Sequence, residues 1–105
     1  MWTLTVRSPD SKPSEYLLKP GINSIGRRQD NDILISDEAA SRLHAQIFLD
    51  ESMDALAIRD LGSRNGTYIN RRSIDEAETL LDGDEIQIGK FRLVFIRCAN
   101  RRSPL

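Results

Sequence analysis

The clearest structural signal in this chain is the stretch Glu85-Ile86-Gln87-Ile88-Gly89-Lys90-Phe91, which continues to Arg97. Apolar and polar side chains alternate on both sides of Gly89-Lys90, as they do in half-buried strands. A two-residue Gly-X connection between such runs is typical of a type II′ turn. We therefore expect a hairpin with strands at 85–88 and 91–97, preceded by another turn at Asp82-Gly83.

Short strand candidates separated by turns fill the rest of the chain. Trp2, Leu4 and Val6 alternate with polar residues, which predicts a strand over 2–7. Further short strands are expected at 16–18, 22–26, 33–35, 55–58 and 67–69. Two prolines predict a loop over 8–14, and the polar segment 70–78 has room for a helical turn. Many short strands punctuated by turns indicate an all-β sandwich.

The segment 36–49 is ambiguous from its residues alone. Ser36, followed by Asp37, Glu38 and two alanines, has the pattern of an N-capped helix. Alternation over 45–49 favours a strand instead, and no glycine follows to end a helix. Both interpretations stay open on this evidence.

Composition restricts the classes of function. The chain has 105 residues and a net charge of -1, which fits one domain and argues against a general nucleic-acid binder. Cys98 is the only cysteine, so no internal disulfide can form and a reducing, cytoplasmic location is expected, with the nucleus also compatible. No apolar run approaches the roughly 20 residues that cross a bilayer, so we expect no membrane contact. One histidine and one cysteine cannot build a metal site, and no cofactor is expected.

Three turn-forming pieces carry the polar residues of interest. They are Gly26-Arg27, the stretch Ser41-Arg42-Leu43-His44, and Asn65-Gly66-Thr67 with Arg64 before it. Loops that a rigid scaffold positions are common binding sites. Arginines beside hydroxyl and amide groups are the chemistry of a phosphate or carboxylate receptor.

The ordered set of motifs resembles a forkhead-associated (FHA) domain from about residue 4 to residue 96. The matching motifs are Ile25-Gly26-Arg27, Asn31-Asp32-Ile33, Ser41-Arg42-Leu43-His44, Asn65-Gly66-Thr67-Tyr68-Ile69-Asn70 and Leu81-Asp82-Gly83-Asp84. The resemblance implies an all-β, FHA/SMAD-like sandwich of two twisted antiparallel sheets, with about eleven short strands and recognition loops at one end. It also implies a strand over 44–49, an FHA domain over 1–98 and a polar tail over 99–105.

The resemblance implies a non-enzymatic module of signalling that binds phosphothreonine segments of partner proteins, produced by an upstream Ser/Thr kinase. Arg27 matches the family's phosphate arginine. Ser41 matches its hydroxyl donor, with the Ser41 backbone amide nearby. Arg42 and Arg64 are further candidate contacts, and Asn65 matches the amide that holds the peptide backbone. Structural support of the site is expected from Gly26, His44, Gly66, Thr67 and Asn70.

Two alternative hypotheses compete with phosphothreonine binding. In the first, the same loops assemble with a partner or scaffold without any phosphate. In the second, Ser41 and His44 form the nucleophile and base of a hydrolase, oriented by Asp37 or Asp60. The sequence lacks a nucleophile-elbow motif and a glycine-rich oxyanion loop, so we do not expect an enzyme.

Overall fold

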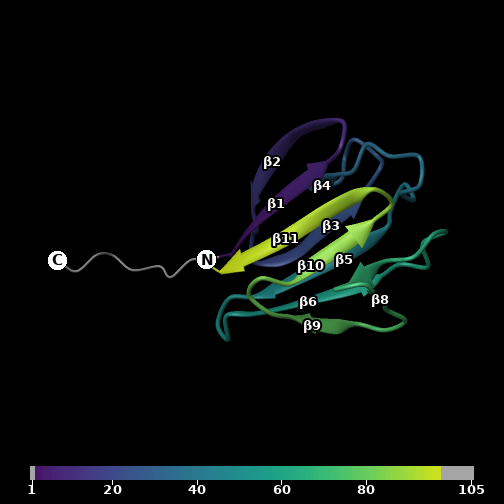
Figure 1. Ribbon diagram of the computed structural model, residues 1–105. Coiled ribbons are helices and arrows are strands. Elements are labelled where there is room, and N and C mark those ends of the chain that lie inside the picture. The colour runs from purple at the N-terminus through teal and green to yellow at the C-terminus, as the bar shows by residue number, and fades with distance from the viewer. Residues whose placement is uncertain (1, 98–105) are drawn as a thin grey trace.

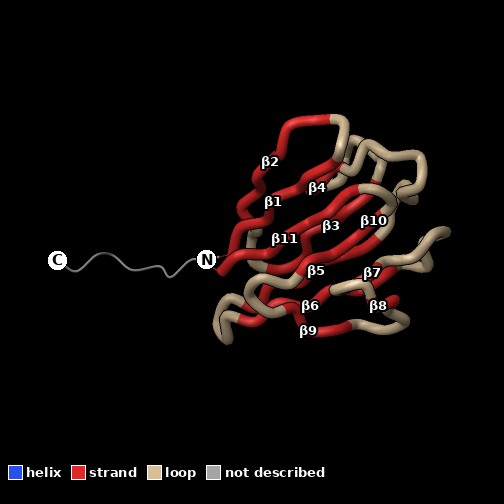
Figure 2. Tube along the Cα trace, in the orientation of Figure 1, coloured by secondary structure: helices blue, strands red, loops and turns tan. Residues whose placement is uncertain are grey.

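The computed structural model describes residues 2–97, which form eleven strands and no helix (Figures 1 and 2). This confirms the expected all-β sandwich of about eleven short strands. Cys98, the expected domain boundary at residue 98 and the tail 99–105 lie outside the described residues. The strands are β1 (Trp2–Ser8), β2 (Ser11–Leu17), β3 (Gly21–Gly26), β4 (Ile33–Leu34), β5 (Ala45–Asp50), β6 (Ala55–Asp60), β7 (Tyr68–Ile69), β8 (Arg72–Ser73), β9 (Glu78–Leu80), β10 (Glu85–Ile88) and β11 (Phe91–Arg97).

The strands form two sheets, one with the order β2-β1-β11-β10-β7-β8 and the other with the order β4-β3-β5-β6-β9. Every described pair is antiparallel except β3 with β4, which is parallel. The expected hairpin joins β10 to β11, with Ile88 opposite Phe91. Gly89 has a positive φ of 59° and Lys90 does not, which is the pattern of a type II′ turn.

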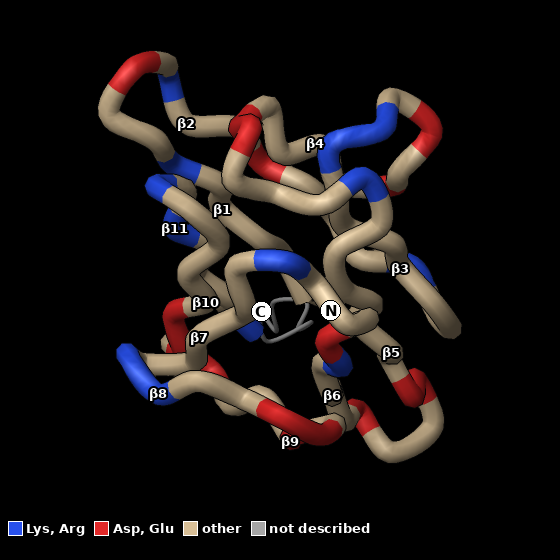
Figure 3. Tube along the Cα trace, turned by 90° about the vertical axis from the view of Figure 1, so that its right-hand side faces the viewer, with Lys and Arg blue, Asp and Glu red and all other residues tan. Residues whose placement is uncertain are grey.

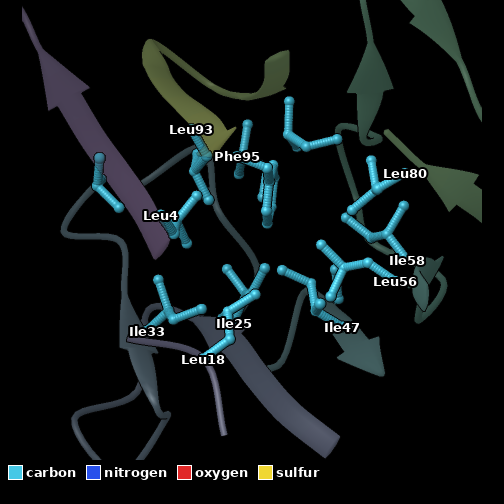
Figure 4. Packing of buried hydrophobic residues seen from close by; sticks show 14 of the residues in the cluster. Leu4, Leu18, Ile25, Ile33, Ile47, Leu56, Ile58, Leu80, Leu93 and Phe95 are labelled. Carbon is cyan, nitrogen blue, oxygen red and sulfur yellow. The ribbon is translucent and has the colours of Figure 1, made fainter. Parts of the chain in front are cut away.

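The core lies between the sheets and collects the inward-facing residues of most strands (Figure 4). Leu4 of β1 is paired with Phe95 of β11, and Ile47 of β5 with Ile58 of β6. All four side chains are buried because alternate residues of a strand point to the same face. Within residues 2–97 there is no helix that could cross a membrane.

The loop expected over 8–14 is wrong, because most of it belongs to strand β2. Pro13 has no N–H to donate, and a proline is therefore tolerated only where a ladder does not need that donor. β2 lies at the edge of its sheet and pairs on one side only, with β1. The strand also consists mainly of exposed residues, so it lacks the alternating pattern by which a strand is found in a sequence.

The helical alternative for 36–40 and the helical turn considered for 70–78 are also absent from the described residues. The Asp37 side chain accepts a hydrogen bond from the Ala39 amide, and the Ala40 amide reaches the Asp37 carbonyl, so a single turn replaces the helix. Asn70 and Arg71 have φ values of 48° and 74° and form a two-residue connection between β7 and β8. The strand implied over 44–49 is confirmed as β5.

Several loops gather at one end of the sandwich, on the right in Figure 1. They are the β3–β4, β4–β5 and β6–β7 loops and the β10–β11 turn. Figure 3 looks onto this end and shows basic and acidic segments among the loops. This end carries the residues singled out from the sequence.

Candidate functional site

A close crossing of two backbones places Arg27 beside Ser41. The Arg27 amide donates to the Ser41 carbonyl at 3.0 Å, and the Arg28 amide donates to the Arg42 carbonyl at 3.2 Å. A Cβ atom on Gly26 would lie 2.1 Å from the Arg42 carbonyl oxygen, so only glycine permits this approach. Asn31, which belongs to one of the motifs of the resemblance, donates from Nδ2 to the same oxygen at 2.8 Å.

Arg27 is exposed, yet its side chain is held in place. Its Nε donates to the Ala40 carbonyl at 3.0 Å, which leaves the two terminal nitrogens of the guanidinium for other partners. Arg27 lies in the wall of a hollow of about 230 Å³. The hollow is lined by Arg27, Glu38, Ala39, Ala40, Ser41, Arg42 and Arg64.

Ser41 lines this hollow, and its hydroxyl, unlike its amide, can still donate a hydrogen bond. The hydroxyl oxygen accepts a hydrogen bond from the Arg64 amide at 3.0 Å, so the hydroxyl proton is available to a ligand. The Ser41 amide donates to Nδ1 of His44 at 3.0 Å and is therefore already used. The next amide, that of Arg42, has no acceptor among residues 2–97 and is the backbone donor that sequence reasoning missed.

His44 is fully buried and links two loops. Nδ1 accepts from the Ser41 amide, and Nε2 lies 2.9 Å from the Gly66 carbonyl, so Nε2 carries the proton and donates it. Burial lowers the pKa of His44 below 6.5, although the Gly66 carbonyl and the Asp60 carboxylate oppose this. The structure thus places His44 as a neutral brace between the β4–β5 and β6–β7 loops.

The hydrogen bonds of Ser41 and His44 do not fit a nucleophile and its base. Both ring nitrogens of His44 are engaged with backbone groups, and the Ser41 hydroxyl makes no hydrogen bond to the ring. A general base must reach the proton that it removes. This geometry does not support the hydrolase alternative.

Asp60 organises the β6–β7 loop, a role that the sequence reading did not assign to it. Its Oδ1 accepts from the hydroxyls of Thr67 at 2.7 Å and Ser63 at 2.5 Å, and its Oδ2 accepts from the Gly62 and Ser63 amides. Burial raises the pKa of Asp60, but the hydrogen bonds from Ser63 and Thr67 and the nearby His44 together outweigh it, so this pKa is lowered. An aspartate followed two and three residues later by amide donors is the signal of an Asx turn.

Asn65 and Asn70 lie in different surroundings. Asn65 is exposed and donates from Nδ2 to the Ala39 carbonyl at 2.8 Å, beside the hollow but not in its wall. Gly66 follows with a φ of 89°, which shapes the turn, and Thr67 is fully buried. Asn70 bonds to Asp84 and to the Glu85 amide, so it supports the β7–β8 turn and not the hollow.

Three arginines and one glutamate, Glu38, line the hollow, so its lining carries an excess of positive charge. Arg27, Arg42 and Arg64 line it, and none of them forms an ion pair among residues 2–97, whereas the neighbouring Arg28 is paired with Asp30 at 2.6 Å. Guanidinium groups hold phosphate or carboxylate oxygens through parallel N–H bonds. The part of the chain that the structure describes contains no group of three His, Cys, Asp or Glu residues placed to hold a metal ion.

Comparison with known proteins agrees with this geometry. Residues 23–89 match the sequence profile of the FHA domain. The glycogen accumulation regulator GarA of Mycobacterium tuberculosis is 45% identical over 93 residues, which are 89% of this chain and 56% of GarA. The chain therefore spans about half the length of the curated relatives that it matches.

Solved structures share the fold. One, from a structural and functional study of phosphothreonine-dependent FHA domain interactions, is 31% identical with a TM-score of 0.81, covering 92% of this chain and 98% of that one. Another is EmbR of Mycobacterium tuberculosis, solved in complex with a low-affinity phosphopeptide. It is 32% identical with a TM-score of 0.78, and the match covers 96% of this chain and 26% of EmbR.

Proposed function

The chain belongs to the FHA domain family, and on this basis we propose that its loop end binds phosphothreonine segments of partner proteins. A Ser/Thr kinase upstream would generate these ligands, and the protein would act in the cytoplasm by binding and not by catalysis. The structures that it resembles include one studied for phosphothreonine-dependent interactions and one solved with a phosphopeptide. GarA, the relative at 45% identity, is named as a regulator.

One observation carries the proposal: Ser41 and three arginines that form no ion pair within residues 2–97 line the same hollow. A phosphothreonine brings a charge of about -1.5 to -2 and three strong acceptor oxygens. Arg27, held by the Ala40 carbonyl, can bond two of those oxygens at once. The Ser41 hydroxyl and the Arg42 amide supply further donors, and Arg64 adds charge.

Asn65 would hold the peptide itself. It is exposed beside the hollow, and its side chain has bonding capacity beyond the single bond to Ala39. An amide can donate to and accept from the backbone of an extended peptide. Preference for threonine over serine would add the burial of one methyl group, worth about 0.8 kcal/mol, and the stiffness of a β-branched side chain.

The test compares two arginine variants of equal charge change. Each charge-assisted bond contributes about 1.5–3 kcal/mol, so Arg27→Ala should weaken binding of a phosphothreonine peptide at least about tenfold. Arg59→Ala is the control, because Arg59 is exposed on β6 and forms no ion pair among the described residues. Calorimetric titration measures both. If Arg27→Ala bound the peptide and its cellular partners normally, phospho-independent assembly would replace this proposal.

A further inference from the structure

Glu38 occupies a fixed position at the corner of the turn that forms one wall of the hollow. The Ala40 amide closes this turn onto the Asp37 carbonyl at 2.9 Å. The Asp37 carboxylate accepts from the Ala39 amide at 2.9 Å and from the Lys90 amide at 3.0 Å. The second bond ties the turn that carries Glu38 to the β10–β11 connection, so this turn is anchored to the sandwich.

The charge of Glu38 is unusual for its surroundings. Its side chain is exposed and lines the hollow together with three arginines. It nevertheless forms no ion pair within residues 2–97. A carboxylate beside a phosphate site repels a doubly charged ligand, since like charges at short range raise the free energy of the complex. Glu38 therefore lowers affinity for a phosphopeptide unless the ligand brings a compensating positive charge.

Asn65 indicates which part of a ligand would meet Glu38. The Asn65 side chain is bonded to the carbonyl of Ala39, the residue directly after Glu38. A peptide backbone held by Asn65 next to its phosphothreonine therefore passes beside the turn. A long basic side chain from that part of the peptide can reach the Glu38 carboxylate.

We propose that Glu38 is a specificity-determining residue that selects a lysine or arginine close to the phosphothreonine and disfavours an acidic residue there. This inference rests on the proposed phosphothreonine binding. Exposed ion pairs are modest, so lysine in place of alanine at that ligand position should strengthen binding about twofold to fivefold. Glutamate should weaken binding by a similar factor, and both effects should shrink as salt is raised.

The experiment scans the residues on both sides of a phosphothreonine. At each flanking position in turn, the synthetic peptide carries lysine, alanine or glutamate, and binding is followed by fluorescence anisotropy at low and high salt. The proteins are the unaltered chain, Glu38→Gln, Glu38→Lys and the control Glu51→Gln. Glu51 is an exposed glutamate in the β5–β6 turn, and it also forms no ion pair among residues 2–97. Circular dichroism verifies that every variant is folded.

We expect one flanking position, or two adjacent ones, at which the unaltered chain prefers lysine over glutamate. Glu38→Gln should abolish this preference and tighten binding of the alanine peptide, Glu38→Lys should invert it, and Glu51→Gln should leave it unchanged. Phosphate-dependent binding without such a preference, or a preference that persists in Glu38→Gln, would overturn the role of Glu38 alone. Equal binding of phosphorylated and unphosphorylated peptides would instead overturn the proposed function.

Discussion

Replacing His44 by alanine should weaken both the fold and the site, because the ring joins two loops. The substitution removes the acceptor of the Ser41 amide and the donor to the Gly66 carbonyl, at 3.0 and 2.9 Å, from a fully buried position. A buried polar group left without a partner costs about 1–3 kcal/mol. Because water can enter the vacated space and bond to one of the groups, we expect a loss of about 2–4 kcal/mol in the free energy of unfolding.

Urea unfolding followed by tryptophan fluorescence measures this loss. Asn23→Ala is the matched control, since Asn23 is also a buried polar residue with several hydrogen bonds, but these reach Lys19, Gly21 and Ile47. Both variants should be destabilised. Only His44→Ala should bind a phosphothreonine peptide more weakly once the unfolded fraction is taken into account, because His44, unlike Asn23, links Ser41 to Gly66.

Two results would refute this reasoning. The first is an unfolding free energy for His44→Ala within roughly 0.5 kcal/mol of the unaltered chain, the range of a neutral surface substitution. The second is equal phosphopeptide affinity for the folded forms of His44→Ala and Asn23→Ala. Either would show that His44 does not brace the site.

Three further substitutions or conditions test the surrounding structure. Gly26→Ala should lower the free energy of unfolding by about 1–3 kcal/mol, since its Cβ would lie 2.1 Å from the Arg42 carbonyl oxygen. An unchanged free energy of unfolding in urea together with unchanged peptide affinity would contradict the backbone crossing described above. Arg71→Gly should raise stability by about 0.5–1 kcal/mol, because Arg71 has a φ of 74° that glycine adopts without strain; a lower melting temperature would oppose this. The free energy of unfolding, measured in urea at several pH values, should be highest above pH 6.5 and fall as the pH drops below it. The reason is that the unfolded chain protonates its only histidine there, whereas burial lowers the pKa of His44 in the folded chain. His44→Asn should flatten this part of the pH profile.

Strands that are determined by the residues of their own segment could be predicted from the sequence. The β10–β11 hairpin follows from alternation on both sides of a Gly-Lys turn, and β1 follows from the alternation of Trp2, Leu4 and Val6. β2 could not be predicted in the same way, because its position depends on pairing with β1 at a sheet edge that accepts Pro13. The turn at 37–40 is ambiguous in the sequence because Ser36 and the residues after it fit a capped helix. In the fold, Asp37 instead bonds to the turn and to a distant hairpin.

For the site, the sequence could predict which residues take part but not the hydrogen bonds that they form. The resemblance pointed to Arg27, Ser41, Arg42 and Arg64, and the fold brings these four residues to one hollow. The hydrogen bonds of the backbone amides could not be predicted, because the Ser41 amide donates to the His44 ring only in the folded chain. The functions of Asp60 and Glu38 likewise depend on loops that meet in space.

The most direct test of phosphothreonine binding is a calorimetric titration of the unaltered chain with one peptide in three forms: phosphothreonine, phosphoserine and unmodified threonine. We predict clear binding of the phosphothreonine form, weaker binding of the phosphoserine form and no measurable binding of the unmodified peptide. Equal affinity for all three forms would contradict the assignment of the hollow around Arg27 and Ser41 as a phosphate site.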